Sequence, residues 1–350
     1  MRVTLAGQDY ELRPGESVLE GMARHGVRLP WVCRAGACHS CLVRVVHGDP
    51  GTGSRHGLKD AWRDRGYALA CLAHPGSDLT ISFADDDSTT PATLLPSRML
   101  SPQVLLARVR PVRPVTFRPG QHVVLQGAGM ARSYSIANLP AEAEHDGIAF
   151  HVRVYPSGAF SSWLARAAPG TPVTIGAPAG ECCYLSTDRD GPLLLAGTGT
   201  GIAPLTAVAR DALANRHRAP IVIIHGAARP QGLYLDRRQA LLEPDQGHGQ
   251  PAAAAGHRPV RWRACVHSRG GDIAETVARE AAALGDPGRI RAYLCGGPTS
   301  VARMRRALFM AGMSLQNIHA DAFLPAVRAA AAGRTEPPGT AAPARGRPAS

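Results

Sequence analysis

The sequence predicts a multidomain chain of the α+β and α/β classes, in which a small mixed unit, an antiparallel β-barrel and a doubly wound parallel sheet follow one another. Three observations predict it. Gly (38) and Pro (29) are plentiful while aromatic residues make up 5%, which favours a strand-rich protein with many turns over a helix bundle. Short alternating strands between turns fill residues 92–180. From residue 191 the strands become continuous apolar runs that alternate with helices, as in parallel sheets buried on both faces.

Length and composition argue against several classes of protein. The chain has 350 residues, which is room for two or three domains of about 100–200 residues each. Its 45% apolar content is ordinary for a globular protein. No run approaches the roughly 18 apolar residues of a membrane span, and the N-terminal stretch lacks the apolar region of a secretory signal. We expect a cytoplasmic protein with no membrane partner, monomeric on its own.

The formal net charge of +12 raises the question of nucleic-acid binding. Lys59 is the one lysine among the 39 basic residues, and this excess of Arg is typical of a compositional bias. The basic residues are scattered, with few aromatic residues between them, and residues 1–87 hold 10 basic and 11 acidic residues. We therefore expect no nucleic-acid partner.

The first predicted domain covers residues 1–85 and combines strands with one short helix. Ser17 follows a Pro-Gly turn and is a candidate cap for a helix whose apolar face contains Val18, Met22 and Val27. An acidic and polar run then predicts a linker over 86–91. The predicted strands are 2–5, 8–12, 42–46 and 79–83.

Two larger domains are predicted after the linker. Residues 92–190 have the pattern of an antiparallel β-barrel with one clear helix, and residues 191–325 have that of a doubly wound α/β domain. The tail, 326–350, has too few large apolar residues to pack, and disorder is expected there. Strands are predicted at 104–109, 122–126, 132–136, 149–154, 172–176, 193–196, 221–226 and 291–296, and helices at 160–168, 202–215 and 299–311.

Four cysteines have the spacing of a metal centre. Cys33-x4-Cys38-x2-Cys41, followed by Cys71, is the plant-type [2Fe–2S] spacing, in which a tight loop supplies three thiolates and a distant turn the fourth. Gly36 lies where the loop must curl and aim N–H groups at the sulfur atoms. A zinc site or buried structural thiols are the alternatives, but zinc sites usually pair two short C-x2-C hooks. The sequence therefore predicts a [2Fe–2S] cluster on these four cysteines.

These segments resemble a known family. CRAGACHSC at 33–41, with LACLAHPGSDLTI at 69–81, resembles a plant-type ferredoxin domain of the β-grasp fold, and the chain beyond that domain resembles the ferredoxin–NAD(P)H reductase superfamily. Together, over residues 1 to about 325, they resemble the iron–sulfur flavoprotein reductase components of multicomponent oxygenases. The reductase that serves a deoxysugar dehydratase shares this domain order. The resemblance implies a barrel that binds FAD, favoured over FMN by analogy, and an α/β domain that binds NAD(P)H.

The resemblance implies a flavin site on two short motifs. RSYS at 132–135 is similar to the family's RxYS, and GAFS at 158–161 to its G-x-x-S; an ordinary strand is the alternative for RSYS. By resemblance Arg132 pairs with the FAD pyrophosphate, Tyr134 stacks on the isoalloxazine ring, and Ser135 hydrogen-bonds near flavin N5. Ser161 is expected to cap the following helix and offer its amides to phosphate. The expected flavin residues are Arg132, Ser133, Tyr134, Ser135, Gly158 and Ser161, of which Ser135 is also catalytic.

A nicotinamide site is expected on the α/β domain. The run LLLAGTGTGIAP at 193–204 predicts a strand, a glycine-rich turn that lets the backbone approach a pyrophosphate, and a helix start. A tight βα loop is the alternative. CGGP at 295–298 resembles the family's CGxP, which implies that Cys295 lies beside the nicotinamide C4; a buried thiol at a strand end is the alternative. The expected residues are Gly197, Gly199, Thr200, Gly201, Cys295 and Gly296, of which Cys295 is also catalytic.

Two further residues complete the expected site. HADAF at 319–323 resembles the family's terminal acidic-x-aromatic segment, with Asp321 where Glu is usual. This implies that Phe323 is catalytic and covers the flavin face that nicotinamide must reach; a C-terminal core plug is the alternative. Arg229 follows the strand at 221–226, where it can pair with a 2′-phosphate, and this favours NADPH. Because the resembled reductases mostly use NADH, we predict NADH with measurable use of NADPH.

Together the sites predict an electron-transfer oxidoreductase. A nicotinamide gives up two electrons as hydride and a [2Fe–2S] cluster takes one at a time, so a flavin must stand between them. The predicted order is NADH, FAD, [2Fe–2S], and then a terminal oxygenase component or another soluble electron acceptor. The alternatives are a reductase partner of a deoxysugar dehydratase and a non-catalytic redox carrier or sensor. The intact motifs at 197–204 and 295–298 argue against the carrier.

Overall fold

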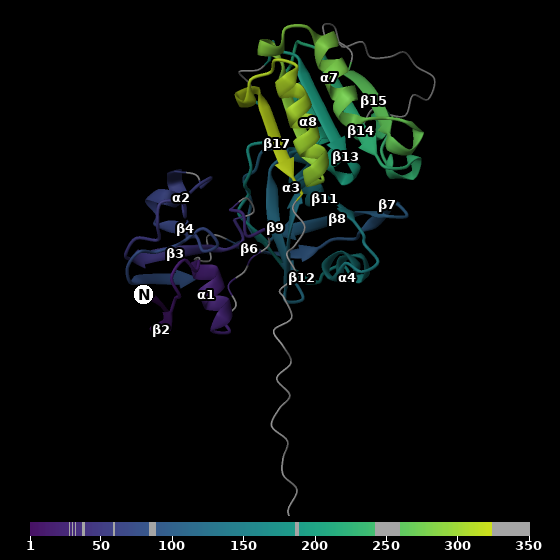
Figure 1. Ribbon diagram of the computed structural model, residues 1–350. Helices are drawn as coiled ribbons and strands as arrows, with labels where there is room; N and C mark the ends of the chain where they lie inside the picture. The colour runs from purple at the N-terminus through teal and green to yellow at the C-terminus, as the bar shows by residue number, and fades with distance from the viewer. Residues whose placement is uncertain are drawn as a thin grey trace, which may run out of the picture.

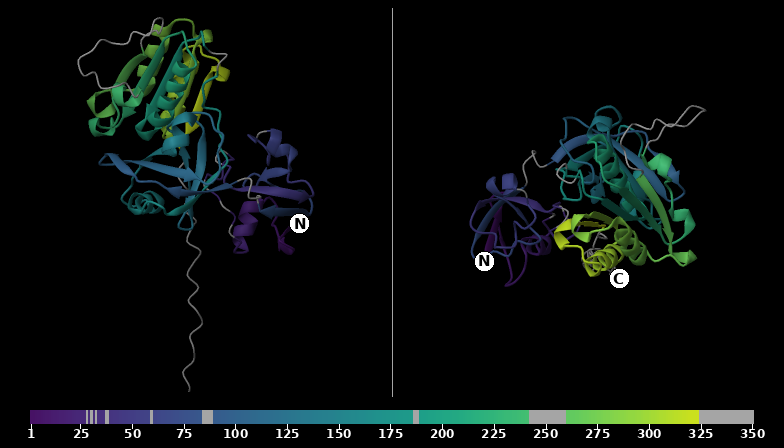
Figure 2. Two further views of the ribbon diagram at one scale, coloured as in Figure 1. Left: turned by 180° about the vertical axis from the view of Figure 1, so that it is seen from behind. Right: turned by 90° about the horizontal axis from the view of Figure 1, so that it is seen from above.

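The computed structural model describes residues 1–27, 29, 31, 33–36, 39–58, 60–83, 89–185, 189–241 and 260–323, which form three units in chain order. The middle unit lies between the other two, with the first unit at its side and the third above it (Figures 1 and 2). Buried apolar clusters fill all three units. The predicted fold class is confirmed.

The first unit is a mixed sheet with one helix packed on it. Its elements are β1 (Arg2–Leu5), β2 (Gln8–Glu11), α1 (Val18–Arg24), β3 (Leu42–His47), α2 (Asp60–Asp64), β4 (Tyr67–Leu69) and β5 (Leu79–Phe83). The strand order is β2-β1-β5-β3-β4; β1 and β5 pair in parallel, and the other neighbours are antiparallel. Val18 and Met22 are buried in this core, as predicted, whereas Val27 lies beyond the end of α1. α2 and β4 are not among the predicted elements.

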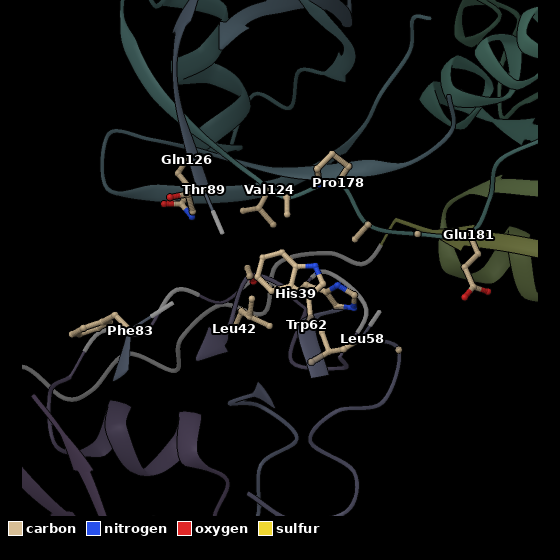
Figure 3. Close-up of a pocket in the computed structure, with 16 residues that line it drawn as sticks. His39, Leu42, Leu58, Trp62, Phe83, Thr89, Val124, Gln126, Pro178 and Glu181 are labelled. Carbon is tan, nitrogen blue, oxygen red and sulfur yellow. The ribbon is translucent and has the colours of Figure 1, made fainter. Parts of the chain in front are cut away.

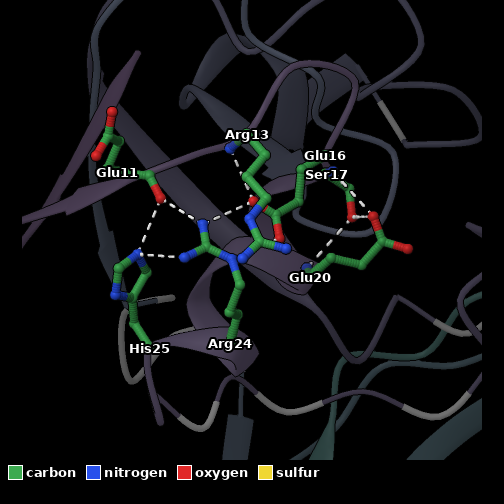
Figure 4. A network of polar contacts seen from close by, with 7 residues as sticks. All are labelled: Glu11, Arg13, Glu16, Ser17, Glu20, Arg24 and His25. Atoms are coloured by element: carbon green, nitrogen blue, oxygen red, sulfur yellow. Dashed lines mark hydrogen bonds and ion pairs between the residues drawn. The ribbon is translucent and has the colours of Figure 1, made fainter.

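Ser17 caps α1, as predicted, in a reciprocal arrangement with Glu20. The Ser17 Oγ accepts a hydrogen bond from the Glu20 N–H (3.3 Å), and the Glu20 carboxylate accepts one from the Ser17 N–H (3.0 Å) (Figure 4). Arg24, in the last turn, donates to the Glu16 carboxylate, and this contact lowers the pKa of Glu16 to about 2. Arg24 also donates to the Glu11 carbonyl oxygen (2.6 Å), which ties α1 to β2.

The middle unit is a curled antiparallel sheet. Its elements are β6 (Thr89–Leu94), β7 (Arg98–Ser101), β8 (Val104–Pro111), β9 (His122–Gly127), β10 (Met130–Ser135), α3 (Pro140–Asp146), β11 (Ile148–Arg153), α4 (Ala159–Arg166) and β12 (Pro172–Gly176). The strand order is β10-β9-β12-β6-β8-β11, with β7 on β8. The Ala137 N–H donates to the Ala149 carbonyl oxygen (2.9 Å), which brings the segment after β10 against β11, the strand at the other end of this order. β6 begins at Thr89, inside the predicted linker.

The third unit is a parallel sheet with helices on both faces. Its elements are β13 (Leu193–Thr198), α5 (Ile202–Ala214), β14 (Ile221–Ala227), α6 (Arg237–Leu241), β15 (Val260–Val266), α7 (Ile273–Leu284), β16 (Arg291–Gly296), α8 (Pro298–Met310) and β17 (Ile318–Ala322). The strand order is β15-β14-β13-β16-β17, and every pair is parallel. One apolar cluster packs α5 on one face, and another packs α7 and α8 on the opposite face. The predicted tail, 326–350, lies outside the described residues.

The strand order of this sheet has a switch point between β13 and β16, where successive strands begin to be added on the other side of β13. β14 and β15 lie on one side of β13, and β16 and β17 on the other. Ligands of doubly wound sheets bind at the carboxyl ends of the strands at such a point. Within the described ranges, no helix is both long and apolar enough to cross a membrane.

Candidate functional site

Three of the four predicted cluster ligands come together in the first unit. Cys33, Cys41 and Cys71 are buried, and Cys38 lies outside the described residues. A hydrogen bond from the Cys41 side chain lowers the pKa of Cys71, the Gly36 N–H acts in the same direction, and burial opposes both. Among the described side chains no group of three or more is arranged to hold a single metal ion.

The backbone of the loop fits a cluster. The Ala35 N–H donates to the Cys33 Sγ (3.3 Å), and Gly36 has φ +73°. A Cβ at Gly36 would lie 2.5 Å from a methyl carbon of Leu72, so both conformation and space require glycine. Amide groups aimed at sulfur stabilise thiolates and help set a cluster potential.

The cysteine loop packs on the middle unit. Cys33 contacts Val124 of β9, with Ala131 of β10 beside them. A largely apolar cavity of about 220 Å³ opens next to this contact, between the two units (Figure 3). It is lined by His39, Leu42, Leu58, Trp62 and Phe83 of the first unit and by residues of the middle unit that include Thr89, Gln126, Pro178 and Glu181. The cysteine loop therefore lies against the hairpin that carries RSYS.

The side chains of RSYS point alternately to the two faces of β10. The ring centroid of Tyr134 lies 6.2 Å from that of Phe150 and 5.9 Å from that of Phe160. Burial raises the pKa of Tyr134. Arg132 lies on the same side of the strand and donates to the Ala131 carbonyl oxygen (2.6 Å). The buried Ser133 Oγ has no hydrogen-bond partner among the described residues. An aromatic ring and a half-buried guanidinium on one face of the strand suit a flavin nucleotide.

The role expected of Ser161 as a helix cap is wrong. The cap of α4 is Gly158, and Ser161 lies inside the first turn. The Ser161 Oγ accepts a hydrogen bond from the Tyr155 N–H (3.2 Å) and donates to the Gly158 carbonyl oxygen (3.4 Å). A Cβ at Gly158 would lie 2.5 Å from this hydroxyl. Ser161 therefore fixes the loop that leads into α4, and the first-turn amides remain available to an anion.

The glycine-rich turn is packed against its own chain. A Cβ at Gly197 would lie 2.7 Å from the Gly201 backbone, and one at Gly201 would lie 2.4 Å from the Cys295 carbonyl oxygen. These two glycines therefore allow β13, α5 and β16 to meet. Gly199 has φ +57° with Thr200 beside it, and a Cβ added at Gly199 would lie 3.7 Å from a guanidinium nitrogen of Arg153. Arg153 is not among the predicted site residues, and its position beside a turn that suits pyrophosphate makes it a candidate.

The three residues expected to be catalytic, Ser135, Cys295 and Phe323, lie where the middle and third units meet. The Ser135 Oγ donates to the Asp321 carboxylate (3.0 Å), so the shorter acid still reaches the hydroxyl. Asp321 of β17 lies opposite Cys295 of β16 in the register of these two parallel strands. Burial raises the pKa of the Cys295 thiol, and the Asp321 charge adds to this. The Phe323 N–H donates to the Gly296 carbonyl oxygen (2.8 Å), which holds Phe323 at the same strand ends.

Arg229 lies apart from this convergence, at the carboxyl end of β14. It is exposed, and its carbonyl oxygen accepts a hydrogen bond from the Gly232 N–H. The nearest acid along the chain, Asp236, accepts a hydrogen bond from the Gln239 N–H (2.9 Å) at the start of α6. Arg229 is therefore positioned at the sheet edge where an adenine ribose binds in doubly wound folds.

Family models match the three units separately. A 2Fe-2S iron-sulfur cluster binding domain matches residues 3–76, an oxidoreductase FAD-binding domain matches residues 93–184, and an oxidoreductase NAD-binding domain matches residues 195–306. These descriptions agree with the groups that the three sets of residues fit.

Relatives match over nearly the whole chain. The chain is 30% identical over 321 residues to the ferredoxin–NAD(P)+ reductase component of a naphthalene 1,2-dioxygenase system from Pseudomonas putida, covering 89% of this chain and 94% of that one. It is 32% identical over 341 residues to the reductase subunit of an aromatic O-demethylase from Amycolatopsis, covering 93% and 98%. The crystal structure of an Amycolatopsis cytochrome P450 reductase aligns with a TM-score of 0.59 and 29% identity, over 93% and 99%.

Proposed function

The chain belongs to the family of ferredoxin–NAD(P)+ reductase components of oxygenase systems, and we propose that NADH is its preferred electron donor and a terminal oxygenase component its electron acceptor. It is an oxidoreductase that carries electrons from NAD(P)H by way of FAD and a [2Fe–2S] cluster. The relatives named as reductase components of dioxygenase and monooxygenase systems support an oxygenase as the acceptor.

The contact between Ser135, Asp321 and Cys295 carries the assignment of the hydride-transfer site. A bound flavin supplies the capacity to take up a hydride and return its electrons one at a time. Asp321 accepts the Ser135 hydrogen bond and so fixes the direction of the hydroxyl at the end of the motif assigned to flavin. Cys295 lies at the end of β16 next to Asp321, where the nicotinamide ring is proposed to lie, and Phe323 covers that position until the nucleotide arrives.

The position of the cysteine loop supports electron transfer from FAD to the [2Fe–2S] cluster. Cys33 packs on Val124 and Ala131, and Ala131 precedes Arg132 in the chain. One cluster ligand, Cys33, therefore lies directly on the hairpin assigned to the flavin. Such contact keeps the distance between the two redox groups short.

One pair of assays tests this function. The full-length protein is expected to reduce ferricyanide with NADH, and to reduce cytochrome c only when the cluster is present. Purification of bound partners from native cells, followed by reconstitution, then identifies the acceptor. Recovery of a sugar dehydratase would replace the oxygenase in this proposal, and absence of NADH oxidation would favour the non-catalytic carrier.

Arg132→Ala is expected to purify depleted of FAD. The change removes a charged contact to a diphosphate, and hydrogen bonds to charged groups contribute about 1.5–3 kcal/mol, which corresponds to roughly tenfold to hundredfold weaker binding. The ratio of flavin absorbance to protein measures the loss. Arg166→Ala, which removes an exposed arginine at the end of α4 in the same unit, is the control and should keep its flavin. A full flavin content in Arg132→Ala would show that Arg132 does not hold the cofactor.

Arg229→Ala is expected to shift nucleotide preference toward NADH. Loss of an exposed ion pair to a 2′-phosphate removes about 1 kcal/mol, so kcat/KM with NADPH should fall roughly fivefold. The value with NADH should stay within error, because NADH lacks that phosphate. Arg305→Ala, on the exposed side of α8, is the control. An unchanged ratio of the two kcat/KM values would remove Arg229 from the ribose site.

A further inference from the structure

Two thiols outside the cysteine loop meet at the boundary between the middle and third units. The Sγ atoms of Cys182 and Cys295 lie 3.6 Å apart, although the residues are 113 positions apart in the chain. Cys182 belongs to the connection from β12 to β13, and Cys295 to the end of β16. Their exposed fractions are 3% and 0%. Sulfur atoms in a disulfide are about 2.05 Å apart, so a movement of about 1.5 Å separates this contact from a covalent bond.

The backbone is tightly packed on both sides of the pair. A Cβ at Gly120 would lie 2.0 Å from the Cys182 carbonyl oxygen, and one at Gly201 would lie 2.4 Å from the Cys295 carbonyl oxygen. Two residues after Cys182, the Tyr184 carbonyl oxygen accepts a hydrogen bond from Arg118 (2.5 Å). Neither segment has room to withdraw, so the fold keeps the two sulfur atoms adjacent.

We propose that Cys182 and Cys295 form a reversible disulfide when the protein meets hydrogen peroxide, and that this bond stops the use of NAD(P)H. The Cys182 thiolate attacks one peroxide oxygen, the O–O bond breaks, and the leaving hydroxide takes up the thiol proton as water; Cys182 becomes a sulfenic acid. The Cys295 sulfur then displaces the sulfenic hydroxyl group, which leaves with the Cys295 proton as a second water. Two thiols lose two electrons, and one peroxide is reduced to two waters.

The order of attack follows from the surroundings of the two thiols. Burial raises the pKa of Cys295, the neighbouring Cys182 and the charge of Asp321 add to this, and a backbone hydrogen bond from Asp321 opposes it. A thiol that holds its proton is a poor nucleophile. Cys182 retains slight exposure and is therefore assigned the attack on peroxide, with Cys295 as the residue that resolves the sulfenic acid.

The loss of activity rests on the proposed function, because it requires Cys295 to lie at the nicotinamide. Formation of the disulfide between Cys182 and Cys295 does not depend on that position. A disulfide pulls the Cys295 sulfur toward Cys182 and joins the end of β16 to the connection before β13. Displacement of a reacting group by about 1 Å lowers rates roughly hundredfold. The oxidised fraction is therefore expected to lose about that factor in the NADH-dependent reduction of ferricyanide.

Peptide mapping tests the bond directly. The full-length holoprotein is treated with hydrogen peroxide, quenched, alkylated and digested without reductant. We expect a crosslinked pair of peptides that contain Cys182 and Cys295 and lack two hydrogen atoms, and dithiothreitol should restore both peptides and the ferricyanide activity. Cys183→Ala changes the adjacent buried thiol and should keep the crosslink; Cys182→Ala should lose it. Cys182→Ser, which is nearly isosteric, repeats the test should the alanine variant fail to fold.

Two results refute the proposed bond. One is a bond between Cys182 and Cys183, and the other is Cys295 that remains open to alkylation after inactivation. A mapped crosslink in protein that still reduces ferricyanide would refute the loss of activity and, with it, the place of Cys295 at the nicotinamide. Absence of NADH oxidation before any treatment would instead count against the proposed function.

Discussion

Cys71→Ser is expected to lose the cluster and keep the flavin. Cys71 interacts with Cys41 and Cys33 inside the first unit, and a serine hydroxyl does not give up its proton to iron as readily as a thiol does. The middle unit has an apolar core of its own, so its fold should persist. Ferricyanide reduction by NADH, which needs only the flavin, should stay near that of the unchanged protein, while cytochrome c reduction falls to background. Iron content, the visible spectrum and the two rates measure this.

The control for that variant is a second buried thiol. Cys265→Ser in β15 replaces a cysteine whose Sγ accepts from the Thr276 hydroxyl (3.5 Å), far from the loop in the chain. It should keep the iron content. Equal loss of both activities in Cys71→Ser, with flavin still bound, would refute an order in which electrons reach the flavin before the cluster.

The sequence predicts best the strands whose residues are all buried and therefore all apolar. The runs at 193–196 and 221–226 are apolar throughout because β13 and β14 are buried on both faces, and their prediction as parallel strands is confirmed. β15 is not predicted because it is an edge strand that carries Arg261 and Arg263, both paired with Glu280 of α7, and so lacks a continuous apolar run. β4 is three residues long, too short to show a period.

In the candidate site, the sequence likewise predicts the features that local spacing carries and misses the contacts between distant segments. The cluster cysteines are identified from spacing because three lie in one short loop, whereas the contact of Cys182 with Cys295 joins residues 113 positions apart and has no local signal. Ser161 is expected to be a helix cap because Ser favours that position, yet the chain turns at Gly158 and the hydroxyl fixes the loop instead. Asp321 stands out in the sequence as an unusual acid, and only the packing of β17 against β16 shows that it reaches Ser135.

Gly201→Ala is expected to remove NADH-dependent activity with every acceptor while flavin and cluster remain. Gly201 has an ordinary helical conformation (φ −62°), so alanine adds no backbone strain. Its Cβ, however, would lie 2.4 Å from the Cys295 carbonyl oxygen and 2.7 Å from the Gly296 nitrogen. These are backbone atoms that no rotamer change can move, so β16 must shift relative to α5. A shift of about 1 Å at the assigned nicotinamide position lowers rates roughly hundredfold.

Gly270→Ala separates this effect from general loss of stability in the third unit. Gly270 has φ +80° and no heavy atom within 4 Å of an added Cβ, so alanine there costs about 1–2 kcal/mol through backbone strain alone. That variant should unfold at a lower temperature yet keep its ferricyanide rate at 25 °C. Gly201→Ala should lose the rate even where circular dichroism and flavin content show a folded protein. Normal kcat and KM for NADH in a folded Gly201→Ala protein would mean that β16 can move without cost, and that its end does not position the nicotinamide.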